Sequence, residues 1–550
     1  MSQRNLANLN NNVMSKLLEK GIIFEKERIL NDVIPNELSY YHNKRLFWIH
    51  DLEFYDSTYN CIGVEPNNLI KKENVNFNDA LKILFIKIVE LTNVQSGGIG
   101  LINFDDKMSK FITNETNEEI KYSIKWFFND LNMHIRKGCE KAYVTLNFGL
   151  STSINGRRIS CLLLEAFEEG DIYGNPFIFP NLVFKIKKGV NSSENDKNYD
   201  LFLKSCSTTA KCMIPTYLNC DSKLNINIDP KELGIMGCRT RVANNLYNNK
   251  KTSINRGNIA CVTINLVQLA IKSEHNYNLF LSNIKETLDK GRKLLKHRLY
   301  RLSKYGDFSY IKNNNLYLNS TSKKNIDMLK NGTLAFGFIG LWESIGILEN
   351  IDSIDLKFLK NNHNIGYNII KYMREIIDSY IKKDNLNYSL LASASEGVSG
   401  VFFDNDSCNY NLNKYLINQG YYTNSFHIPV NIKLNIYDKI KLESKFHSLC
   451  NGGSITYIEL RESPKQNYLA IKDIVQFACE QDCNYIGINY PLDICNICKY
   501  KGNIEVNCPI CNSDNILRLR RVSGYLSDTD KFSKGKSQEL KNRVSHDTMI

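Results

Sequence analysis

Four cysteines near the C-terminal end of the chain have the spacing of metal ligands. Cys495 and Cys498 form one Cys-x-x-Cys pair, Cys508 and Cys511 form a second, and nine residues separate the two pairs. Four thiolates at this spacing fit around one tetrahedral zinc ion, which then has no open coordination position for a substrate. The spacing therefore predicts a short structural zinc ribbon that holds the chain after it in a fixed position.

Gly524 lies in that following stretch, within the sequence Arg-Val-Ser-Gly-Tyr at residues 521–525. Because glycine lacks a Cβ, its Cα can flatten as a carbon radical that the flanking amide and carbonyl groups delocalise. The pentapeptide resembles the signature of glycyl radical enzymes. With the four cysteines before it and several matching positions after it, the segment resembles more narrowly the C-terminus of anaerobic ribonucleoside-triphosphate reductases. The later positions are Phe532, Gly535, Lys536, Glu539, Arg543, Val544 and His546.

A second segment, residues 235–241 with the sequence Ile-Met-Gly-Cys-Arg-Thr-Arg, resembles the finger loop of the same family. The resemblance implies that Cys238 forms a thiyl radical. The chemistry needs an atom whose bond to hydrogen is about as strong as a ribose C–H bond, which a cysteine sulfur provides and a serine oxygen does not. Met236 matches a family methionine beside this cysteine, and core packing is its alternative role. Cys61 lies at a position like that of the second active-site cysteine, and the alternative is a buried strand cysteine.

Residues 256–266 resemble the strand that follows the finger loop in the family. An uncharged amide facing the ribose can hold its hydroxyl groups without taking a proton. Asn258 is the first candidate for this role and Asn265 is the second. Capping of backbone groups is the alternative for both side chains.

Residues 393–397, Ser-Ala-Ser-Glu-Gly, lie where the family tends to have Thr-Pro-Ala-Glu before a helix. Small and hydroxyl-bearing residues at a helix start expose backbone N–H groups to a phosphate. Ser393, Ser395 and Glu396 are therefore predicted to bind substrate. The family proline is absent here, and ordinary helix capping by Ser393 or Ser395 is the alternative. Ser454 is another departure, because some family members carry histidine at that position.

Helical and strand-like segments alternate along the chain, which predicts an α/β architecture. Helices are expected at 78–94 and 117–137 from their apolar spacing, and strands at 142–148 and 178–183. The resemblance implies a ten-stranded α/β barrel of two five-stranded parallel half-sheets, with the finger loop inside and the Gly524 loop meeting its tip.

Three regions are expected: an N-terminal helical segment at 1–45, the catalytic barrel at 46–485, and a zinc-binding and glycyl radical domain at 486–550. An ATP cone, the regulatory domain that often precedes the barrel in this family, is not expected, because catalytic-like sequence already begins at residue 47.

The composition is that of a globular protein, with 43% hydrophobic and 23% charged residues. No apolar run is long enough to cross a membrane and the polar N-terminus is not a signal peptide, so we expect a cytoplasmic protein with no membrane partner. Sixteen cysteines in such a chain favour reduced thiols, metal ligation and catalysis over disulfides. The net charge of +12 suits an anionic ligand such as a nucleotide, although a lysine-rich composition gives basicity by itself.

Three other functions fit parts of the chain. A glycyl radical enzyme of the pyruvate formate-lyase or diol dehydratase type shares the pentapeptide but lacks the four-cysteine site. A nucleic-acid-binding zinc ribbon would explain the cysteines and the charge, yet it leaves Gly524 and Cys238 without a role. A phosphate-binding loop at residues 534–537 fails because Asp530 stands where that motif needs glycine.

The resemblance also implies cofactors and partners. A radical-SAM activating enzyme, with a 4Fe-4S cluster and S-adenosylmethionine, would generate the radical at Gly524. Cys238 would then mediate reduction of ribonucleoside triphosphates to 2′-deoxyribonucleoside triphosphates for DNA synthesis. Met236 and Cys61 favour formate as the reductant, and a thioredoxin-type dithiol is the competing source. The family further implies a homodimer with dNTP or ATP effectors.

Overall fold

Two half-sheets of parallel strands close on one another and form a ten-stranded barrel. The computed structural model describes residues 12–72, 74–136, 140–394, 396–522 and 524–547. In the first half-sheet the strands pair in chain order. They are β2 (Ile62–Val64), β3 (Ile99–Leu101), β4 (Val144–Phe148), β5 (Asn181–Ile186) and β6 (Thr216–Asn219). The second half-sheet comes from the later part of the chain. Its strands are β9 (Asn258–Asn265), β10 (Thr333–Ile339), β11 (Tyr388–Leu391), β12 (Thr456–Glu459) and β13 (Tyr485–Asn489).

Two antiparallel junctions join the half-sheets. At one junction β13 pairs antiparallel with β6. At the other, an antiparallel bridge joins Gly63 in β2 to Arg256 just before β9. A parallel bridge between Leu391 and Gly453 connects β11 to the segment before β12. The expected ten-stranded barrel is therefore confirmed. Its last strand ends at Asn489, so the barrel continues past the boundary expected at residue 485.

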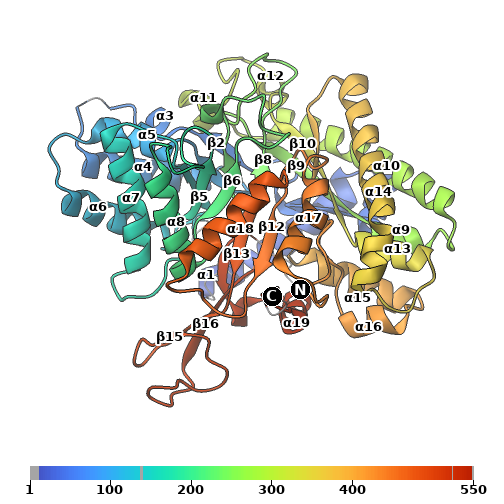
Figure 1. The fold of residues 1–550 in the computed structure, drawn as a ribbon. Helices are drawn as coiled ribbons and strands as arrows, with labels where there is room; N and C mark the ends of the chain where they lie inside the picture. Colours follow the sequence, from blue (N-terminus) through green and yellow to red (C-terminus); the bar gives the residue numbers. More distant parts are fainter. Residues whose placement is uncertain (1–11, 73, 137–139, 395, 523, 548–550) are drawn as a thin grey trace.

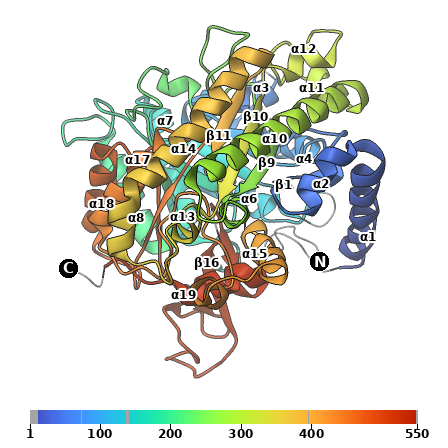
Figure 2. The ribbon, with the colours of Figure 1, turned by 90° about the vertical axis from the view of Figure 1, so that its right-hand side faces the viewer.

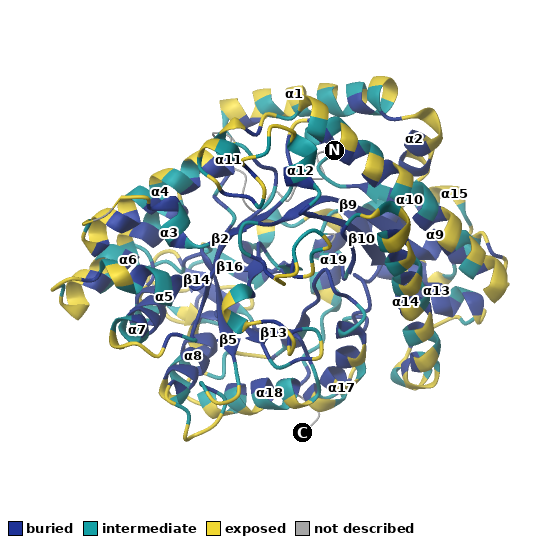
Figure 3. Cartoon of the chain, turned by 90° about the horizontal axis from the view of Figure 1, so that it is seen from above, coloured by how far each residue is buried: buried dark blue, intermediate teal, exposed yellow. Residues whose placement is uncertain are grey.

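Helices surround the barrel as a ring (Figures 1 and 3). Neighbours in this ring pack against one another in the order α4, α6, α7, α8, α18, α17, α14, α10. Their bounds are Phe77–Thr92, Asn117–Leu131, Ile154–Glu169, Tyr199–Cys212, Tyr468–Glu480, Ile436–His447, Leu356–Asp384 and Tyr277–Tyr305. The barrel strands are buried on both faces, as is typical of parallel strands covered by helices. Figure 2 shows α10 and α14, both of 29 residues, side by side on one flank.

The shorter helices connect these elements. They are α3 (Pro66–Leu69), α5 (Phe104–Met108), α9 (Leu266–Ile271), α11 (Ser309–Asn313), α12 (Asn325–Leu329), α13 (Leu341–Leu348), α15 (Val398–Asn409), α16 (Lys414–Gln419) and α19 (Lys534–Asn542). Among the residues described, no helix is both long and apolar enough to cross a membrane.

Two expected helices are present, but one is shorter than its pattern indicated. The helix expected at 78–94 is α4. The helix expected at 117–137 is α6, which ends at Leu131. Its C-cap residue Asn132 donates from its side-chain amide to the carbonyl oxygens of Phe128 and Phe179, so these bonds turn the chain away from the helix axis.

The N-terminal segment is helical, as expected. It consists of α1 (Val13–Arg28), a single π-helical turn (Ile29–Val33) and α2 (Asn36–Asn43). Asn12 and Ser15 form a reciprocal capping box at the start of α1. The next strand, β1 (Phe47–Ile49), pairs antiparallel with β9.

A small hairpin lies inside the barrel. Its strands are β7 (Ile235–Met236) and β8 (Thr240–Arg241), and β7 contacts β2, β3 and β4 of the barrel wall. This hairpin, called the finger below, carries Cys238 at its tip.

The C-terminal region forms a separate antiparallel sheet. Its strand order is β15 (Lys501–Gly502), β14 (Leu492–Cys495), β16 (Ile516–Arg521) and β17 (Leu526–Asp528). The loops at the β15 end project below the barrel in Figure 1. Gly524 lies in the connection between β16 and β17, which is called the radical hairpin below. The four cysteines and Gly524 thus belong to opposite ends of one sheet.

Candidate active site and zinc ribbon

Cys238 and Gly524 are in direct contact, although 286 positions of sequence separate their numbers. A Cβ added to Gly524 would lie 2.0 Å from the Cβ of Cys238 and 2.6 Å from its Cα. Real Cβ atoms do not approach so closely, and any side chain at position 524 would therefore displace the finger. The finger tip and the radical hairpin meet at the two residues between which a hydrogen atom would pass.

The finger is held in the barrel mainly through backbone atoms. Asn147 accepts from the N–H of Ile235 (2.8 Å) and donates to its carbonyl oxygen (3.0 Å). Thr145 donates to the carbonyl oxygen of Gly237 (2.7 Å). The facing strand has glycine at position 98, where a Cβ would lie 2.8 Å from the Cα of Gly237. The missing side chain makes room for the finger backbone.

The radical hairpin is held by side chains instead. Arg521 donates to the carbonyl oxygens of Gly524 (3.2 Å) and Met213 (2.5 Å). The hydroxyl of Tyr525 donates to Glu396 (2.7 Å). The ring of Tyr525 packs edge-on against Tyr143 and stacks on Phe179, and these aromatic rings cover the hairpin beside Gly524.

A cavity of about 680 Å³ opens from the finger tip toward the N-terminal segment. Of the residues proposed from sequence, Cys238, Cys61, Asn258, Ser393 and Glu396 all line it. Met236 does not line it, but packs against Cys61 and Val242 just behind the wall. The volume suits a nucleotide-sized ligand. Residues spread over more than 300 positions of sequence therefore share one site.

Both cavity thiols keep their protons at neutral pH. Burial raises the pKa of Cys238, although the positive charge of Arg239 opposes this effect. Burial likewise raises the pKa of Cys61 to about 12. Each sulfur therefore carries a hydrogen atom, which is what a radical transfer step requires.

Asn60 and Asp51 orient the Cys61 thiol. The thiol donates to the side-chain oxygen of Asn60 (2.6 Å), and its sulfur accepts from the N–H of Gly98 (3.3 Å). The Asn60 amide donates in turn to Asp51 (2.6 Å), which also accepts from Ser96 (3.0 Å). Burial opposes ionisation of Asp51, but the charge of Arg298 and these hydrogen bonds lower the pKa of this carboxyl.

Asn258 and Asn265 are in different environments. Asn258 lines the cavity, and with its amide orientation assigned from hydrogen bonding it donates to the carbonyl oxygens of Thr333 (2.8 Å) and Ala260 (3.3 Å). Its side-chain oxygen remains to accept from a ligand. Asn265 is not among the cavity residues. It caps α9 by accepting from the N–H of Gln268 and donates to Asp406 (2.8 Å), which is the capping alternative.

The segment before α15 reaches the cavity at its helix start. Gly397, the N-cap residue, and Val398 both line the cavity, so backbone N–H groups lie at its edge. Ser393 does not cap the helix; its hydroxyl hydrogen-bonds that of Thr263 (2.8 Å), which contacts Nε2 of His50 (2.7 Å). Ser395 lies outside the described residues.

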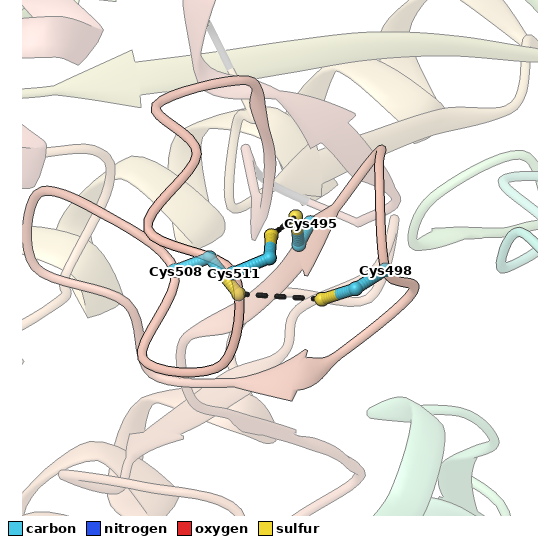
Figure 4. A group of neighbouring side chains, drawn as sticks. All are labelled: Cys495, Cys498, Cys508 and Cys511. Carbon is cyan, nitrogen blue, oxygen red and sulfur yellow. Dashed lines mark hydrogen bonds between the residues drawn. The ribbon is translucent and has the colours of Figure 1, made fainter.

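The four cysteines converge at the far end of the ribbon (Figure 4). All four sulfur atoms lie within 4.8 Å of one another, with Cys495 and Cys511 3.5 Å apart and Cys498 and Cys508 3.4 Å apart. Sulfur atoms bound to one tetrahedral zinc at about 2.3 Å would be separated by similar distances. The donor set therefore fits a zinc ion, and its four members leave no coordination position open.

Several site residues had no role assigned from sequence. They include Asp51 and Asn60, which orient the Cys61 thiol, and Tyr525, whose partner Glu396 is 129 positions away in the chain. His50 lines the cavity, and burial lowers its pKa to about 4, so the imidazole is neutral at pH 7. Lys26, Arg45 and Arg136 also line the cavity, and no motif indicated them. Lys26 pairs with Glu53 (3.5 Å) and Arg136 with Glu140 (3.6 Å), and both carboxylates belong to the same lining.

The whole chain has the fold of solved anaerobic ribonucleotide reductases. One such structure superposes with a TM-score of 0.77 at 16% identity, covering 98% of this chain and 90% of that one. The enzyme from Thermotoga maritima, in complex with dATP and CTP, gives a TM-score of 0.74 at 15% identity over 96% and 92% of the two chains. The barrel and its finger therefore belong to a known enzyme architecture.

Sequence comparison identifies the family. The family model for anaerobic ribonucleoside-triphosphate reductase matches residues 5–546, and the chain belongs to this family. A relative of that description from Haemophilus influenzae is 27% identical, with 95% of this chain and 80% of the relative aligned. The protein is thus an oxidoreductase, and the other three functions considered from sequence are set aside.

Proposed function

We propose that the cavity binds a ribonucleoside triphosphate and that Gly524 and Cys238 carry the radical that reduces it. The observation that supports this most is the contact between the two residues, which no side chain at position 524 would allow. Gly524 stores the radical on Cα, and Cys238 transfers it to substrate. Ser523, the residue before Gly524, lies outside the described residues.

The steps balance as hydrogen-atom transfers. The Gly524 radical takes the hydrogen atom of the Cys238 thiol, so the Gly524 C–H bond forms and the S–H bond breaks. The thiyl radical then takes the 3′ hydrogen atom of the ribose, and the 2′ hydroxyl leaves as water with one proton. Two electrons and a proton from the reductant complete the 2′-deoxy product, and Cys238 returns its hydrogen atom to C3′.

The polar wall can hold the nucleotide. The side-chain oxygen of Asn258 accepts from a ribose hydroxyl, and the neutral amide takes no proton in doing so. Backbone N–H groups at the start of α15 and the guanidinium group of Arg45 attract the triphosphate. Lys26 and Arg136 already pair with Glu53 and Glu140. Ser393 belongs to the same wall, while Glu396 acts on the radical hairpin through Tyr525.

Formate is the reductant that the thiols favour. Cys61 and Met236 pack together behind the cavity, and Cys61 faces the same space as Cys238. Formate would give up one hydrogen atom and one further electron and leave as carbon dioxide, with Cys61 taking part. A dithiol protein, which would supply its own thiols, is the competing source.

The remaining parts of the proposal concern partners. A radical-SAM activating enzyme with a 4Fe-4S cluster supplies the Gly524 radical. Cys495, Cys498, Cys508 and Cys511 hold a structural zinc. The protein works as a homodimer regulated by dNTP or ATP effectors. Its chain is divided into three regions, close to 1–45, 46–489 and 490–550.

The test is an anaerobic reaction with the activating enzyme, nucleoside triphosphates and either formate or a dithiol. Wild type should show a glycyl radical by electron paramagnetic resonance and should form deoxynucleotide with formate. Cys238→Ser should show the radical but form no product, because the O–H bond is too strong for a glycyl radical to open. Turnover by this variant would overturn the assignment.

Two further measurements separate the other roles. Cys61→Ser should lose formate-dependent turnover while keeping the radical signal, and full activity would leave Cys61 as a buried strand cysteine. Air should cleave activated wild type at Gly524, because dioxygen adds to the carbon radical and the peroxyl product breaks the chain. Protein never activated should stay whole, and a cut at another position would count against Gly524.

A further inference from the structure

A second, smaller cavity lies on the other side of the finger. It encloses about 50 Å³, and none of the residues around it lines the larger cavity. The finger contributes Arg239, the radical hairpin contributes Arg521, α19 contributes Arg543, and a loop after α16 contributes Thr423, Asn424 and His427. This small cavity therefore lies where the finger, the radical hairpin and the C-terminal helix meet.

Positive charge exceeds negative charge around it. Five cationic side chains line the cavity, and three carboxylates pair with three of them. Lys439 pairs with Glu443 (2.7 Å), Lys536 pairs with Glu539, and Arg543 contacts both Glu539 (3.0 Å) and Glu459 (3.7 Å). The two remaining cations are Arg239 and Arg521.

Arg239 and Arg521 are 2% and 1% exposed, and within the described ranges neither forms an ion pair with a carboxylate. Arg521 donates only to uncharged oxygens, and Arg239 makes two long bonds of 3.3 Å. The charge of Glu396 acts on Arg239 through space, but this carboxylate accepts from Tyr525 and lines the larger cavity. With Glu396 included, five cations face four carboxylates, which leaves an excess of one positive charge.

Unpartnered polar atoms gather at the same place. Five of the 21 buried side-chain atoms without a hydrogen-bond partner, counted over the described part of the chain, belong to residues lining this cavity. They are Nε of Arg239, Nε of Arg543, Oγ1 of Thr423, Oδ1 of Asn424 and Nε2 of His427. Buried polar groups are rarely left without a partner, so the cavity should contain one.

We propose that this cavity binds a small monovalent anion, such as chloride or formate, together with a water molecule. A cavity of this size has room for one small ion and a water, since about 10–15 Å³ of such space holds one water. The anion accepts from Arg239 and Arg543, whose Nε atoms lack partners, and from Thr423. The water donates to Asn424 and His427. Water alone would satisfy the hydrogen bonds but not the excess charge.

The anion bridges the finger to the C-terminal segment. Arg239 is adjacent in sequence to Cys238, while Arg521 and Arg543 hold the radical hairpin from the other side, the latter by donating to the carbonyl oxygen of Arg521 (3.1 Å). An ion shared by Arg239 and Arg543 stabilises the docked position of the hairpin. This role goes beyond the proposed radical chemistry, and binding can be measured in protein that has never been activated.

The experiment uses the unactivated full chain under anaerobic conditions, crystallised with bromide in place of chloride. Anomalous scattering should show one bromide between Arg239, Arg543 and Thr423. A second crystal, in which formate is added at constant bromide, identifies the occupant. A peak that formate removes assigns a one-carbon carboxylate, and a peak that remains assigns a halide. A cavity with water density and no anomalous peak overturns the proposal.

A melting experiment at constant ionic strength gives an independent measurement. Chloride or formate should raise the melting temperature of wild type relative to gluconate, which is too large to enter, because a ligand of the folded state stabilises it. Thr423→Val removes one donor and should weaken the apparent anion affinity by roughly tenfold. Ser399→Ala is the matched control, because its hydroxyl is also buried and unpartnered but lies outside the cavity. Equal responses of wild type and Thr423→Val would contradict an anion at this place.

Discussion

The two hairpins that meet at the proposed radical site are held by different kinds of contact. The finger is inside the barrel, and its backbone is hydrogen-bonded to Asn147 and Thr145 and packed on strand glycines. The radical hairpin belongs to a sheet whose far end projects below the barrel, and long side chains anchor it (Figure 1). The finger lies within the barrel, whereas the radical hairpin is fixed by hydrogen bonds of Arg521 and Tyr525 and by the packing of Val522 and Tyr525 on Phe179.

This difference suits a site whose proposed radical is generated by another protein. Gly524 is buried against Cys238, so the activating enzyme proposed above would need the hairpin to be released. Side-chain hydrogen bonds each contribute about 1 kcal/mol, so a small set of them allows docking and release. The finger needs no such freedom, and a backbone-packed element provides a fixed position for the thiol.

The largest expected effect comes from disturbing the finger. Gly453 has a φ of +126°, and a Cβ there would lie 2.0 Å from the carbonyl oxygen of Arg239. Gly453→Ala should therefore displace the finger, and a shift of about 1 Å can cost about a hundredfold in rate. Deoxynucleotide formation should fall by at least this factor while the Gly524 radical still forms. Gly420→Ala is the control, with a φ of +73° but its nearest neighbour at 3.4 Å, and it should stay active. Normal turnover by Gly453→Ala would show that the finger is not rigidly held.

A smaller effect is expected from the four-cysteine cluster, which lies at the opposite end of the sheet that carries the radical hairpin. Cys508→Ser removes one of four ligands, so metal analysis should show loss of a zinc that wild type holds at about one per chain. The barrel should stay folded, because its strands and surrounding helices do not include the four cysteines, and the yield of Gly524 radical should fall. Cys408→Ser alters an exposed cysteine of α15 that is not part of the cluster and should change neither quantity. If the zinc-free variant still formed the Gly524 radical in full yield, the zinc ribbon would not be needed to position the radical hairpin.

The smallest effect is expected from one anchoring contact. Tyr525→Phe removes the hydroxyl that donates to Glu396 while keeping the ring between Tyr143 and Phe179. Loss of a hydrogen bond to a charged group costs about 1.5–3 kcal/mol, so turnover should fall about tenfold and hydrogen exchange in residues 521–528 should rise. Tyr173→Phe, which alters a residue that is 72% exposed, should change neither turnover nor hydrogen exchange. Unchanged exchange would mean that the rings alone hold the hairpin.

The sequence predicted the parts of this comparison that depend on local spacing. Three of these parts are short motifs: the cysteine pairs, the Gly524 pentapeptide and the Cys238 segment. Each can be recognised in the sequence without knowledge of the fold. The barrel followed from the resemblance and is confirmed. Helix α4 was expected from its apolar periodicity, and its buried residues recur at that spacing. The prediction of α4 succeeded because the information for it is contained in fewer than about twenty consecutive residues. The roles of Gly524, Cys238 and the four cysteines stay predictions.

Contacts between distant segments could not be predicted in the same way. Glu396 was expected to face the substrate, but its hydrogen bond to Tyr525 joins residues 129 positions apart. Thr263 links Ser393 and His50 only because β1 pairs with β9, and because β10, between β9 and β11, has a glycine at position 337 over which the two hydroxyl groups meet. Asn265 was a candidate for ribose binding, and its place at the end of β9 makes it a helix cap instead. The way the barrel closes determines these partners. The spacing of apolar residues along the chain carries no information about that closure.

The burial of the two cavity thiols also determines which chemistry they can perform. With a pKa of about 12, roughly one Cys61 in 10⁵ is a thiolate at pH 7. Electrophiles such as iodoacetamide, and disulfides seeking exchange, react with the thiolate and should find these sulfurs almost inert. A hydrogen-atom acceptor reacts with the S–H bond instead, which burial leaves intact. The site therefore suppresses two-electron reactions of sulfur and leaves the one-electron route open.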